Sequence, residues 1–212
     1  MSSLSFQKMS SKNSFKIISW NLLHTVGANA YDVAYLINTQ KPDLLLMQEV
    51  TEEINILSDL VGGYYSRFPL PGRKHGVACW SPFPFHAPPS TCALPRGALI
   101  RRVAQLIDCG SFWVANVHLS HGQLLNRRQL QTIAKFLPEH AAVLGDYNLI
   151  GPLNIEGFED IGPRTPTHRM VNLLPIRLDR CLARGMECID KAVLSSYPSD
   201  HHPIMVNLRP IL

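Results

Sequence analysis

The stretches FKIISWN, residues Phe15–Asn21, and DLLLMQEV, residues Asp43–Val50, decide the fold of this chain. Each is a run of β-branched, aromatic or leucine side chains that closes on polar residues, which is typical of a buried strand that reaches the edge of its sheet. Between them, Ala30–Thr39 carries its apolar residues at helical spacing. The sequence therefore predicts a strand, a helix and a second strand as the opening unit.

After this unit, short apolar runs alternate with turn clusters such as SPFPFHAPPS, Ser81–Ser90. A second helix is predicted at Gln123–Leu137, because a proline follows and stops it. The other predicted strands are Gly76–Trp80, Leu99–Ile107, Phe112–Leu119, Ala141–Leu144, Leu178–Leu182 and Ile204–Leu208. Many short strands with few helices favour an α/β fold in which two sheets pack face to face and helices cover the outside.

Length and composition predict one domain. The chain has 212 residues, of which 46% are apolar and 17% charged, and this suits one sizeable core. No internal repeat and no linker rich in Gly, Ser or Pro divides residues 15–212, which we assign to one domain. Residues 1–14 are polar and serine-rich, and we expect a mobile tail there rather than a signal peptide, because an apolar core is missing.

Charge and cysteine content narrow the class of protein. A formal net charge of +4 permits a polyanionic partner without requiring one. The five cysteines form no CxxC pair and leave an odd number, unlike a disulfide framework or a zinc ribbon, so a reducing cytoplasm is expected. No stretch approaches the roughly 18 apolar residues that a membrane span needs. We expect a soluble, monomeric, cytoplasmic protein.

Polar residues recur where predicted strands end, at Asn21, Glu49, His118, Asp146 and Asn148. Strands that deliver their ends to one edge of a sheet would gather these side chains in one cleft. Glu49 closes the buried run LLLMQ, where a carboxylate needs a cation or hydrogen bonds to offset its desolvation. Mg²⁺, which binds carboxylates, water and phosphate, would supply that cation. A solvated acid at a strand end is the ordinary alternative.

The segment VLGDYNLIG carries Asp146 and Asn148 two residues apart, so in extended backbone both point the same way. An Asx-type turn is as common as a functional site for this pattern. In a site, Asp146 would orient and deprotonate an attacking water, and the Asn148 amide would stabilise phosphate oxygens. Asn21 is likewise either a turn residue or an amide ligand near a metal or a phosphate.

Histidines and basic residues supply further candidates. His118 fits either a core histidine or a catalytic one, and His121 is assigned no role because no acid or cysteine supports a metal site there. Arg127 and Arg128 fit either a solvated helix face or a phosphate contact. Lys74, in the segment GRKHG, fits either a basic loop or a phosphate contact.

Asp179 lies inside the apolar run PIRLDRCLARG, where an unpaired carboxylate would be costly. A histidine from SDHHP, Ser199–Pro203, would pair with it. A carboxylate bonded to one imidazole nitrogen fixes the tautomer and favours the cation, so the other nitrogen can face developing negative charge.

The ordered set of these motifs resembles the endonuclease/exonuclease/phosphatase superfamily over residues 15–208. The motifs are SWN with Asn21, MQE with Glu49, NVHL with His118, GDYN with Asp146 and Asn148, RLD with Asp179, and SDH with Asp200 and His201. Each motif is short, but their shared order and spacing are specific. The resemblance implies a four-layer αββα sandwich of two mixed sheets with helices on the outer faces. It also implies Mg²⁺ or Mn²⁺ and hydrolysis of a phosphate ester by in-line attack of water.

By position, the resemblance implies a metal site in which Glu49 is the main ligand, with Asn21 and Asp200 near the same cation. Within the superfamily, relatives that resemble pancreatic deoxyribonuclease, bacterial sphingomyelinases and inositol polyphosphate phosphatases have a second catalytic histidine at the position of His118. Exonuclease III-like abasic-site endonucleases tend to have a tyrosine there, so the chain resembles the first group more closely. In the deoxyribonuclease-like pattern a carboxylate near residues 70–80 supports this histidine, but PGRKHGVAC contains none.

The resemblance also implies that Asp146 and Asn148 orient water and bind phosphate, and that Asp179 holds a catalytic histidine, His201. His202 precedes a proline, where the backbone favours extended geometry, and we interpret it as structural or peripheral. Many members place a threonine before an aromatic residue at Thr167. A histidine follows here instead, and neither residue is assigned a role.

The sequence thus predicts a metal-dependent phosphodiesterase that acts on nucleic acid, favoured by the positive charge and the basic segments GRKH and NRRQ. The alternative keeps the chemistry but changes the substrate to a phosphorylated small molecule or a lipid headgroup, of the inositol phosphate or sphingomyelin type. A binding protein without activity is the third interpretation, and it is disfavoured because every core position of the motifs is filled.

Overall fold

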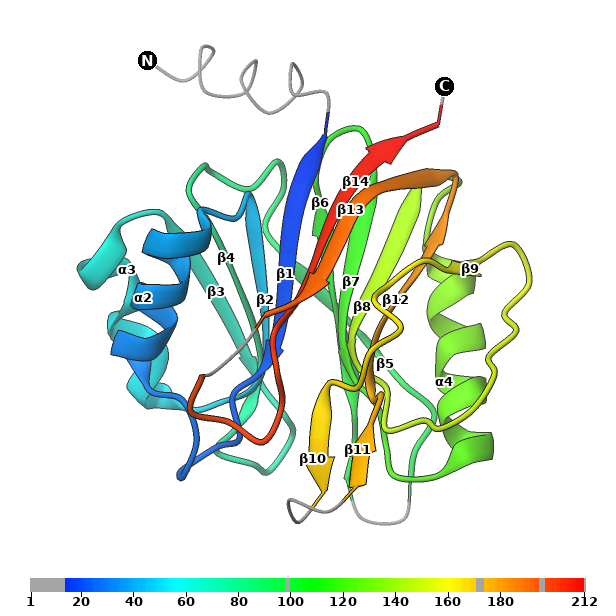
Figure 1. The fold of residues 1–212 in the computed structure, drawn as a ribbon, viewed down its shortest axis with the longest axis horizontal. Coiled ribbons are helices and arrows are strands. Elements are labelled where there is room, and N and C mark those ends of the chain that lie inside the picture. Colours follow the sequence, from blue (N-terminus) through cyan, green and yellow to red (C-terminus); the bar gives the residue numbers. More distant parts are fainter. Residues whose placement is uncertain (1–13, 98–99, 171–173, 195–196, 212) are drawn as a thin grey trace.

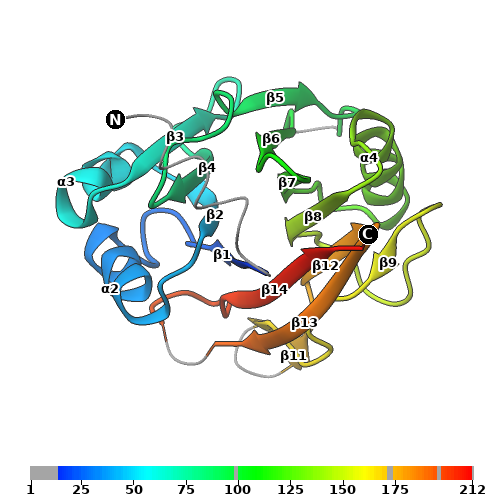
Figure 2. The ribbon, with the colours of Figure 1, turned by 90° about the horizontal axis from the view of Figure 1, so that it is seen from above.

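The computed structural model describes residues 14–97, 100–170, 174–194 and 197–211. Within this part of the chain, two mixed six-stranded sheets pack face to face and helices cover both outer faces (Figure 1). The predicted four-layer α/β sandwich is confirmed. Figure 2 shows the layers from above, with α2 (Ala30–Gln40) and α3 (Leu57–Val61) on one side and α4 (Gln123–Phe136) on the other.

The first sheet has the strand order β13-β14-β1-β2-β4-β3, and the second has the order β5-β6-β7-β8-β12-β9. The first sheet contains β1 (Phe15–Asn21), β2 (Leu44–Val50), β3 (Tyr64–Pro69), β4 (Gly76–Ser81), β13 (Met186–Val193) and β14 (Ile204–Pro210). The second contains β5 (Ser90–Ala93), β6 (Val103–Asp108), β7 (Trp113–His118), β8 (Ala141–Asp146), β9 (Glu159–Asp160) and β12 (Asp179–Arg184). The other described elements are the ribbon of β10 (His168–Met170) and β11 (Leu174–Ile176) and the 3₁₀ helix η1 (Glu52–Ile56).

Three buried apolar clusters hold the four layers together. Between the sheets, Ile17 of β1 and Val114 of β7 belong to one cluster. On the outer face of the first sheet, Leu36 and the other apolar residues of α2 form a second cluster. On the outer face of the second sheet, Leu130 and Ile133 of α4 belong to the third. The apolar faces that the helical spacing predicted are therefore the faces that pack on the sheets.

A network of buried amides, formed by Gln48, Gln105 and Asn116, crosses from one sheet to the other. Gln48 Nε2 on β2 donates to Asn116 Oδ1 on β7 over 2.8 Å. Asn116 Nδ2 donates back to the carbonyls of Met47 and Ala78 in the first sheet, at 3.2 and 2.9 Å, and to Gln105 Oε1 on β6, at 3.1 Å. Because buried polar groups require partners, this amide network fixes how one sheet sits on the other.

Strand direction brings the polar strand ends to one edge of the sandwich. β1 and β2 are parallel, and so are β7 and β8, whereas β14 and β12 run antiparallel to them and begin where they end. His118 and Asp146 are register partners, and Asp146 is also the partner of Asp179. The gathering of polar residues at one edge, predicted from the sequence, follows from this register.

The strands and helices predicted from apolar runs are present, with one correction. Of the predicted run Leu99–Ile107, Leu99 lies outside the described residues, and within the described part the strand begins at Val103. Of the predicted N-terminal tail, residues 1–13 lie outside the described residues, and β1 begins at Phe15. All five cysteines are free thiols. Across the described ranges, no helix has the length and apolar character to cross a membrane.

Candidate active site

A bulge in β2 turns Glu49 toward the cleft. The register of β2 against β4 shifts between Gln48 and Val50, and Glu49 has a φ of 59°, a left-handed conformation that costs free energy for a residue with a side chain. Such a bulge re-aims a side chain that regular pleating would have pointed elsewhere. Both the backbone N–H and the ring of His24 contact Glu49 Oε2. Burial raises the pKa of Glu49, but the hydrogen bonds and charge of His24 outweigh it, so the pKa lies below its ordinary value.

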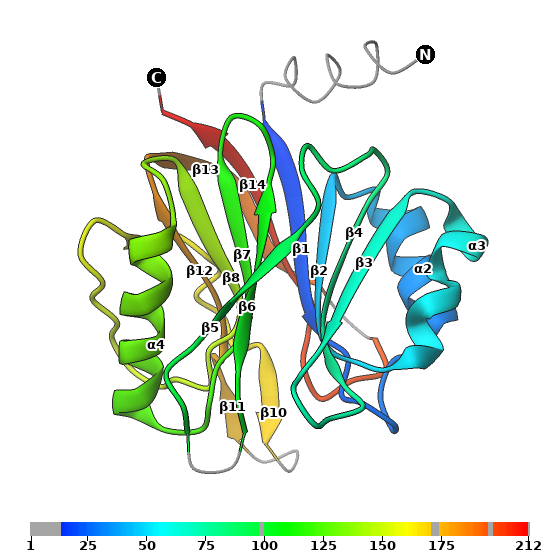
Figure 3. The same cartoon turned by 180° about the vertical axis from the view of Figure 1, so that it is seen from behind.

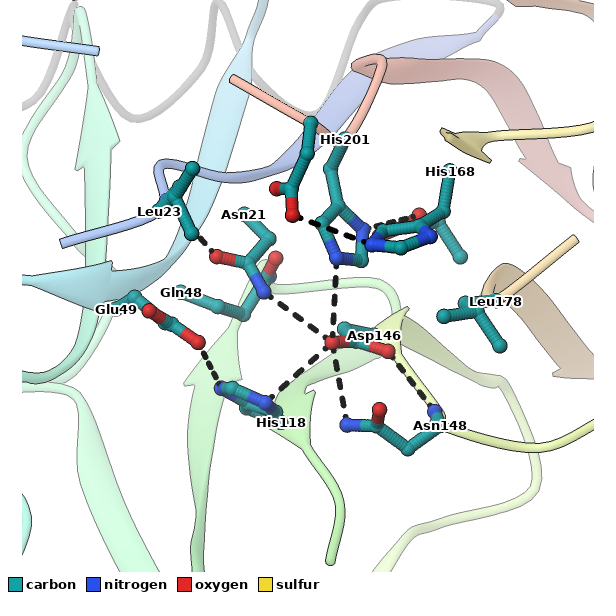
Figure 4. A network of polar contacts seen from close by, with 12 residues as sticks. Asn21, Leu23, Gln48, Glu49, His118, Asp146, Asn148, His168, Leu178 and His201 are labelled. Atoms are coloured by element: carbon teal, nitrogen blue, oxygen red, sulfur yellow. Dashed lines mark hydrogen bonds and ion pairs between the residues drawn. The ribbon is translucent and has the colours of Figure 1, made fainter. Parts of the chain in front are cut away.

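The Asp146 carboxylate, at the end of β8, is the centre of the site (Figure 4). Its Oδ2 accepts from Asn21 Nδ2 and Asn148 Nδ2, each over 3.2 Å, and its Oδ1 accepts from the Asn148 N–H over 2.8 Å. The Nε2 atoms of His118 and His201 lie 3.4 and 3.8 Å from Oδ2. Burial raises the pKa of Asp146, opposed by the charge of His201. Figure 4 shows the four side chains approaching the carboxylate from different sides.

His201 is a buried histidine held by a buried carboxylate. Its Nδ1 lies 2.8 Å from Asp179 Oδ2. Burial lowers the pKa of His201, but the charges of Asp179 and Asp146 outweigh burial and raise it to about 10. The imidazole is therefore a cation at neutral pH, with Nε2 on the side of Asp146.

Thr167 joins the segment that carries Asp179 to the segment that carries His201. Its Oγ1 accepts from the N–H groups of Leu178 and Asp179, at 3.1 and 3.0 Å. Its carbonyl accepts from the His202 N–H over 2.7 Å. The sequence assigned Thr167 no role, and the structure shows it fixing the start of β12 beside the loop that precedes β14.

His118 differs from His201 in charge. Burial, together with the charges of Arg102 and His201, lowers the pKa of His118 well below its ordinary value, so the ring is neutral at pH 7. Its Nδ1 lies 3.9 Å from Glu49 Oε1. A carboxylate thus stands beside this ring after all, supplied by β2 rather than by residues 70–80.

These side chains line a cleft with a volume of about 340 Å³. The predicted site residues on its wall are Asn21, Glu49, His118, Asp146, Asn148, Asp200 and His201. Asp179 lies behind His201 and is fully buried. The structure therefore brings the predicted metal and catalytic residues together.

The predicted phosphate contacts lie elsewhere. The Arg127 guanidinium, on α4, donates to the carbonyls of Gln123 and Pro152, at 2.8 and 3.1 Å. Arg128 is exposed on the same helix, and Lys74 is exposed on the loop between β3 and β4. None of the three lines the cleft.

Two histidines without a role in the sequence analysis, His121 and His168, line the cleft. The His168 ring lies edge-on to His201, with centroids 4.4 Å apart. Its Nε2 lies 3.2 Å from Asp200 Oδ2. The unusual histidine in place of an aromatic residue was the only signal for His168.

His24 is a site neighbour that the sequence did not single out. It follows β1 in a turn where Leu23 and Thr25 have φ values of 54° and 72°. Its ring contacts Glu49 and stacks on His75, with centroids 4.2 Å apart. A turn of this kind has no periodicity, so apolar patterning could not place the ring.

A family model described as Endonuclease/Exonuclease/phosphatase family matches residues 18–201. The chain belongs to this family. The resemblance noted in the motifs is thereby confirmed. No match was found among curated proteins.

Solved structures share the endonuclease/exonuclease/phosphatase fold with this chain at low identity. A family member from Beutenbergia cavernae has a TM-score of 0.75 and 16% identity, covering 94% of this chain and 72% of that one. D. rerio TDP2, complexed with single strand DNA product, has a TM-score of 0.74 and 16% identity, covering 93% and 100%. A functionally unknown conserved protein from Enterococcus faecalis has a TM-score of 0.72 and 19% identity, covering 92% and 99%.

Endonuclease/exonuclease/phosphatase enzymes depend on a divalent metal, and the cleft offers ligands for one. Asn21, Glu49 and Asp200 supply oxygen atoms, which Mg²⁺ and Mn²⁺ prefer. Asp200 Oδ1 is buried and has no hydrogen-bond partner among the described residues. Ligand atoms of His168, Asp200 and His201 also lie within 4.8 Å of one another, but the cationic His201 disfavours a metal there. The oxygen set fits the family's metal.

Proposed function

We propose that the protein is a divalent-metal-dependent phosphodiesterase that hydrolyses nucleic-acid phosphodiester bonds by in-line attack of water. The observation that carries this proposal is the Asp146 carboxylate, surrounded by amide and imidazole groups and next to the cationic His201. A carboxylate that accepts a proton, beside groups that stabilise negative charge, is the arrangement that hydrolysis of a phosphodiester needs.

Asp146 orients the attacking water and takes its proton, and the burial that raises its pKa favours proton uptake. The water oxygen bonds to phosphorus as the P–O bond to the leaving oxygen breaks on the opposite side, and the leaving oxygen takes up a proton from solvent. His201, held as a cation by Asp179, stabilises the negative charge that develops on the phosphate. The amides of Asn21 and Asn148 add neutral hydrogen-bond donors at the same place.

His118 takes a different role from His201. Its lowered pKa keeps the ring neutral, so it acts as a hydrogen-bond donor near Asp146 rather than as a cation. Of these two rings, His201 is the one that brings a positive charge to the reacting phosphate.

Glu49, with Asn21 and Asp200, would hold the metal, which supplies neutralisation of charge on the phosphate oxygens. His24 supports this role because its two contacts fix the orientation of the Glu49 carboxylate.

Nucleic acid is the substrate class that we favour. The net charge of +4 suits a polyanion, and D. rerio TDP2, with the same fold, is complexed with single strand DNA product. The five free thiols support a reducing compartment, which we take to be the cytoplasm.

The test is cleavage of single- and double-stranded DNA and RNA with Mg²⁺ or Mn²⁺, by wild type, Glu49→Gln and His201→Ala in parallel. We expect each variant to lose activity on the order of a hundredfold, as for other groups that stabilise the transition state. Release of phosphate or phosphocholine from a panel of headgroup substrates, with nucleic acid left intact, would show that the substrate is a phosphorylated small molecule or a lipid headgroup instead. Equal residual rates in all three proteins would mean that the cleft is not catalytic.

A further inference from the structure

A second hollow, which we call the arginine groove, lies between the loop after β3 and the loop after β5. It has a volume of about 440 Å³, and three arginines are in its lining. The lining residues are Pro71, Gly72, Arg73, Arg96, Gly97, Ile100 and Arg101. Figure 3 shows the described parts of both loops at the end of the sandwich where β10 and β11 lie. His168 of β10 and Ile176 of β11 line the catalytic cleft.

The arginine groove is positively charged and without counter-ions. Arg73, Arg96 and Arg101 are all exposed. Within the described residues, no carboxylate forms an ion pair with any of the three. Three guanidinium groups around one hollow repel each other unless an anion joins them, and a guanidinium fork matches phosphate oxygens.

Each of the two loops that line the arginine groove lies close to residues that neighbour the catalytic site. Two residues after Arg73, the His75 ring stacks on His24, which contacts Glu49. On the other wall, a Cβ on Gly97 would lie 3.3 Å from Oγ of Ser120, two residues beyond His118. The arginine groove is therefore close to the catalytic cleft, and a chain molecule that extends from the cleft along either loop approaches it.

Arg102 follows Arg101 of the groove lining in the chain and is almost wholly buried, at 3% exposure. Its Nε and Nη1 have no hydrogen-bond partner among the described residues. Burial lowers the pKa of Arg102, and the negative charges of Asp146 and Glu49 act to raise it. A buried guanidinium with unused donors next to the groove extends positive charge from the arginine groove to the reacting centre.

The lining decides which part of a substrate binds here. Among the described residues, the groove is lined by arginine, proline, glycine and isoleucine, with no aromatic ring to stack on a base and no side-chain amide or carboxylate to read a base edge. Contacts made by arginine alone are contacts to phosphate, and they carry no sequence information.

We propose that the arginine groove binds a phosphate next to the one being hydrolysed, so that the substrate is a nucleic-acid strand with several phosphates, recognised without regard to base sequence. This inference rests on the proposed function for the identity of the reaction, but binding by the groove is measured independently of it.

The test compares two double variants that remove the same charge. Arg73→Ala with Arg101→Ala removes one arginine from each groove wall, and Lys135→Ala with Arg209→Ala removes two exposed cations from the last turn of α4 and the end of β14. Substrates are thymidine dinucleotide, which has a single internucleotide phosphate, and a thymidine pentanucleotide.

For the wild type and the control variant, we expect kcat/KM on the pentanucleotide to exceed that on the dinucleotide on the order of tenfold, and the groove variant to lose this advantage. On the dinucleotide, which has no second phosphate for the groove, the groove and control variants should differ far less than on the pentanucleotide. An advantage that the groove variant retains, or that the wild type never shows, overturns the inference.

Binding of a fluorescent pentanucleotide in EDTA gives a second measurement that needs no catalysis. Each phosphate contact on a single strand contributes about 0.7 to the slope of log affinity against log salt, so the groove variant, which loses one phosphate contact, should lose about 0.7 from that slope. Equal slopes for the groove and control variants overturn the inference even where no protein cleaves any oligonucleotide. Loss of inositol hexakisphosphate binding without loss of pentanucleotide binding would also overturn it, since the ligand would then be a compact polyphosphate.

Discussion

His201 and His202 are neighbours in the sequence, yet the structure separates their surroundings. The His201 side chain is buried between Asp179 and Asp146, whereas His202 does not line the cleft and its N–H donates to the Thr167 carbonyl. His201→Ala should lower kcat/KM on the order of a hundredfold or more, because a cationic group at the developing charge is lost. His202→Ala should change it less than about threefold, on the scale of a peripheral surface substitution. Equal losses in two proteins with equal Tm would contradict this assignment.

The charge on His201 depends on its carboxylate partner, and this gives a pH test. With a pKa of about 10, His201 is protonated at neutral pH, and activity should fall only as the pH rises through that value. Asp179→Asn removes the charge that raises the pKa, so the alkaline limb of kcat/KM should move to lower pH. A pH–rate profile of both proteins measures the shift. A limb that stays in place would show that another group titrates there.

Sequence patterning found the residues of the site that end strands and missed those that reach it from turns. Asn21, Glu49 and Asp146 each close an apolar run, so their positions could be predicted. The direction of Glu49 could not, because it depends on the bulge and on a φ of 59°. His24 lies in a turn whose path no periodicity encodes.

At the scale of elements, the apolar runs predicted the interior strands and missed the edge strands. In the described sheets, β3 and β13 border the first sheet, and β5 and β9 border the second. An edge strand has one neighbour and is only partly covered, so it has no need of a continuous apolar run. The residues of β13, MECIDKAV, are mostly exposed or half-buried, which explains why they show no such run.

Gly145 makes the close contact between β7 and β8 possible. It has a φ of 141°, and a Cβ there would lie 1.9 Å from the Val117 carbonyl oxygen on β7. Gly145→Ala should therefore destabilise the protein by about 3 kcal/mol or more, through backbone strain and displacement of a neighbouring strand. Thermal unfolding should show a Tm lower by about 6 °C or more, at about 2–4 °C per kcal/mol. The matched variant Gly151→Ala, where a Cβ meets nothing within 4 Å at a φ of 83°, should lose much less.

At the scale of the whole molecule, the site is divided between the sheets. Asn21 and Glu49 extend from the first sheet, and His118 and Asp146 extend from the second. The amide network around Asn116 fixes the position of one sheet against the other, so it also sets the distance between the two halves of the site.

Asn116→Ala should lower both stability and activity. Loss of the buried amide leaves its partners unsatisfied and should lower the free energy of unfolding by about 3 kcal/mol. The sheets also become free to shift, so kcat/KM should fall even at temperatures well below the Tm, where the protein is folded. Leu130→Ala is the matched control, because it should cost a similar 2–5 kcal/mol (about the range for buried leucine) in the layer between α4 and the second sheet. The control should retain kcat/KM. Equal kcat/KM values for the two variants would show that the amide network contributes stability alone.

The path of the chain through the two sheets also bears on synthesis at the ribosome. The first sheet is begun by β1 to β4 and finished only by β13 and β14, with the second sheet made in between. Trp20 donates to the His201 carbonyl across 181 positions of the chain. β1 can therefore pair with β2 early, but it lacks β14 and the His201 segment until almost the whole family domain has emerged. Contacts of such separation form late. A nascent chain therefore carries Asn21 and Glu49 long before it carries Asp200 and the cationic His201, and the proposed hydrolysis begins only once synthesis of the domain is finished.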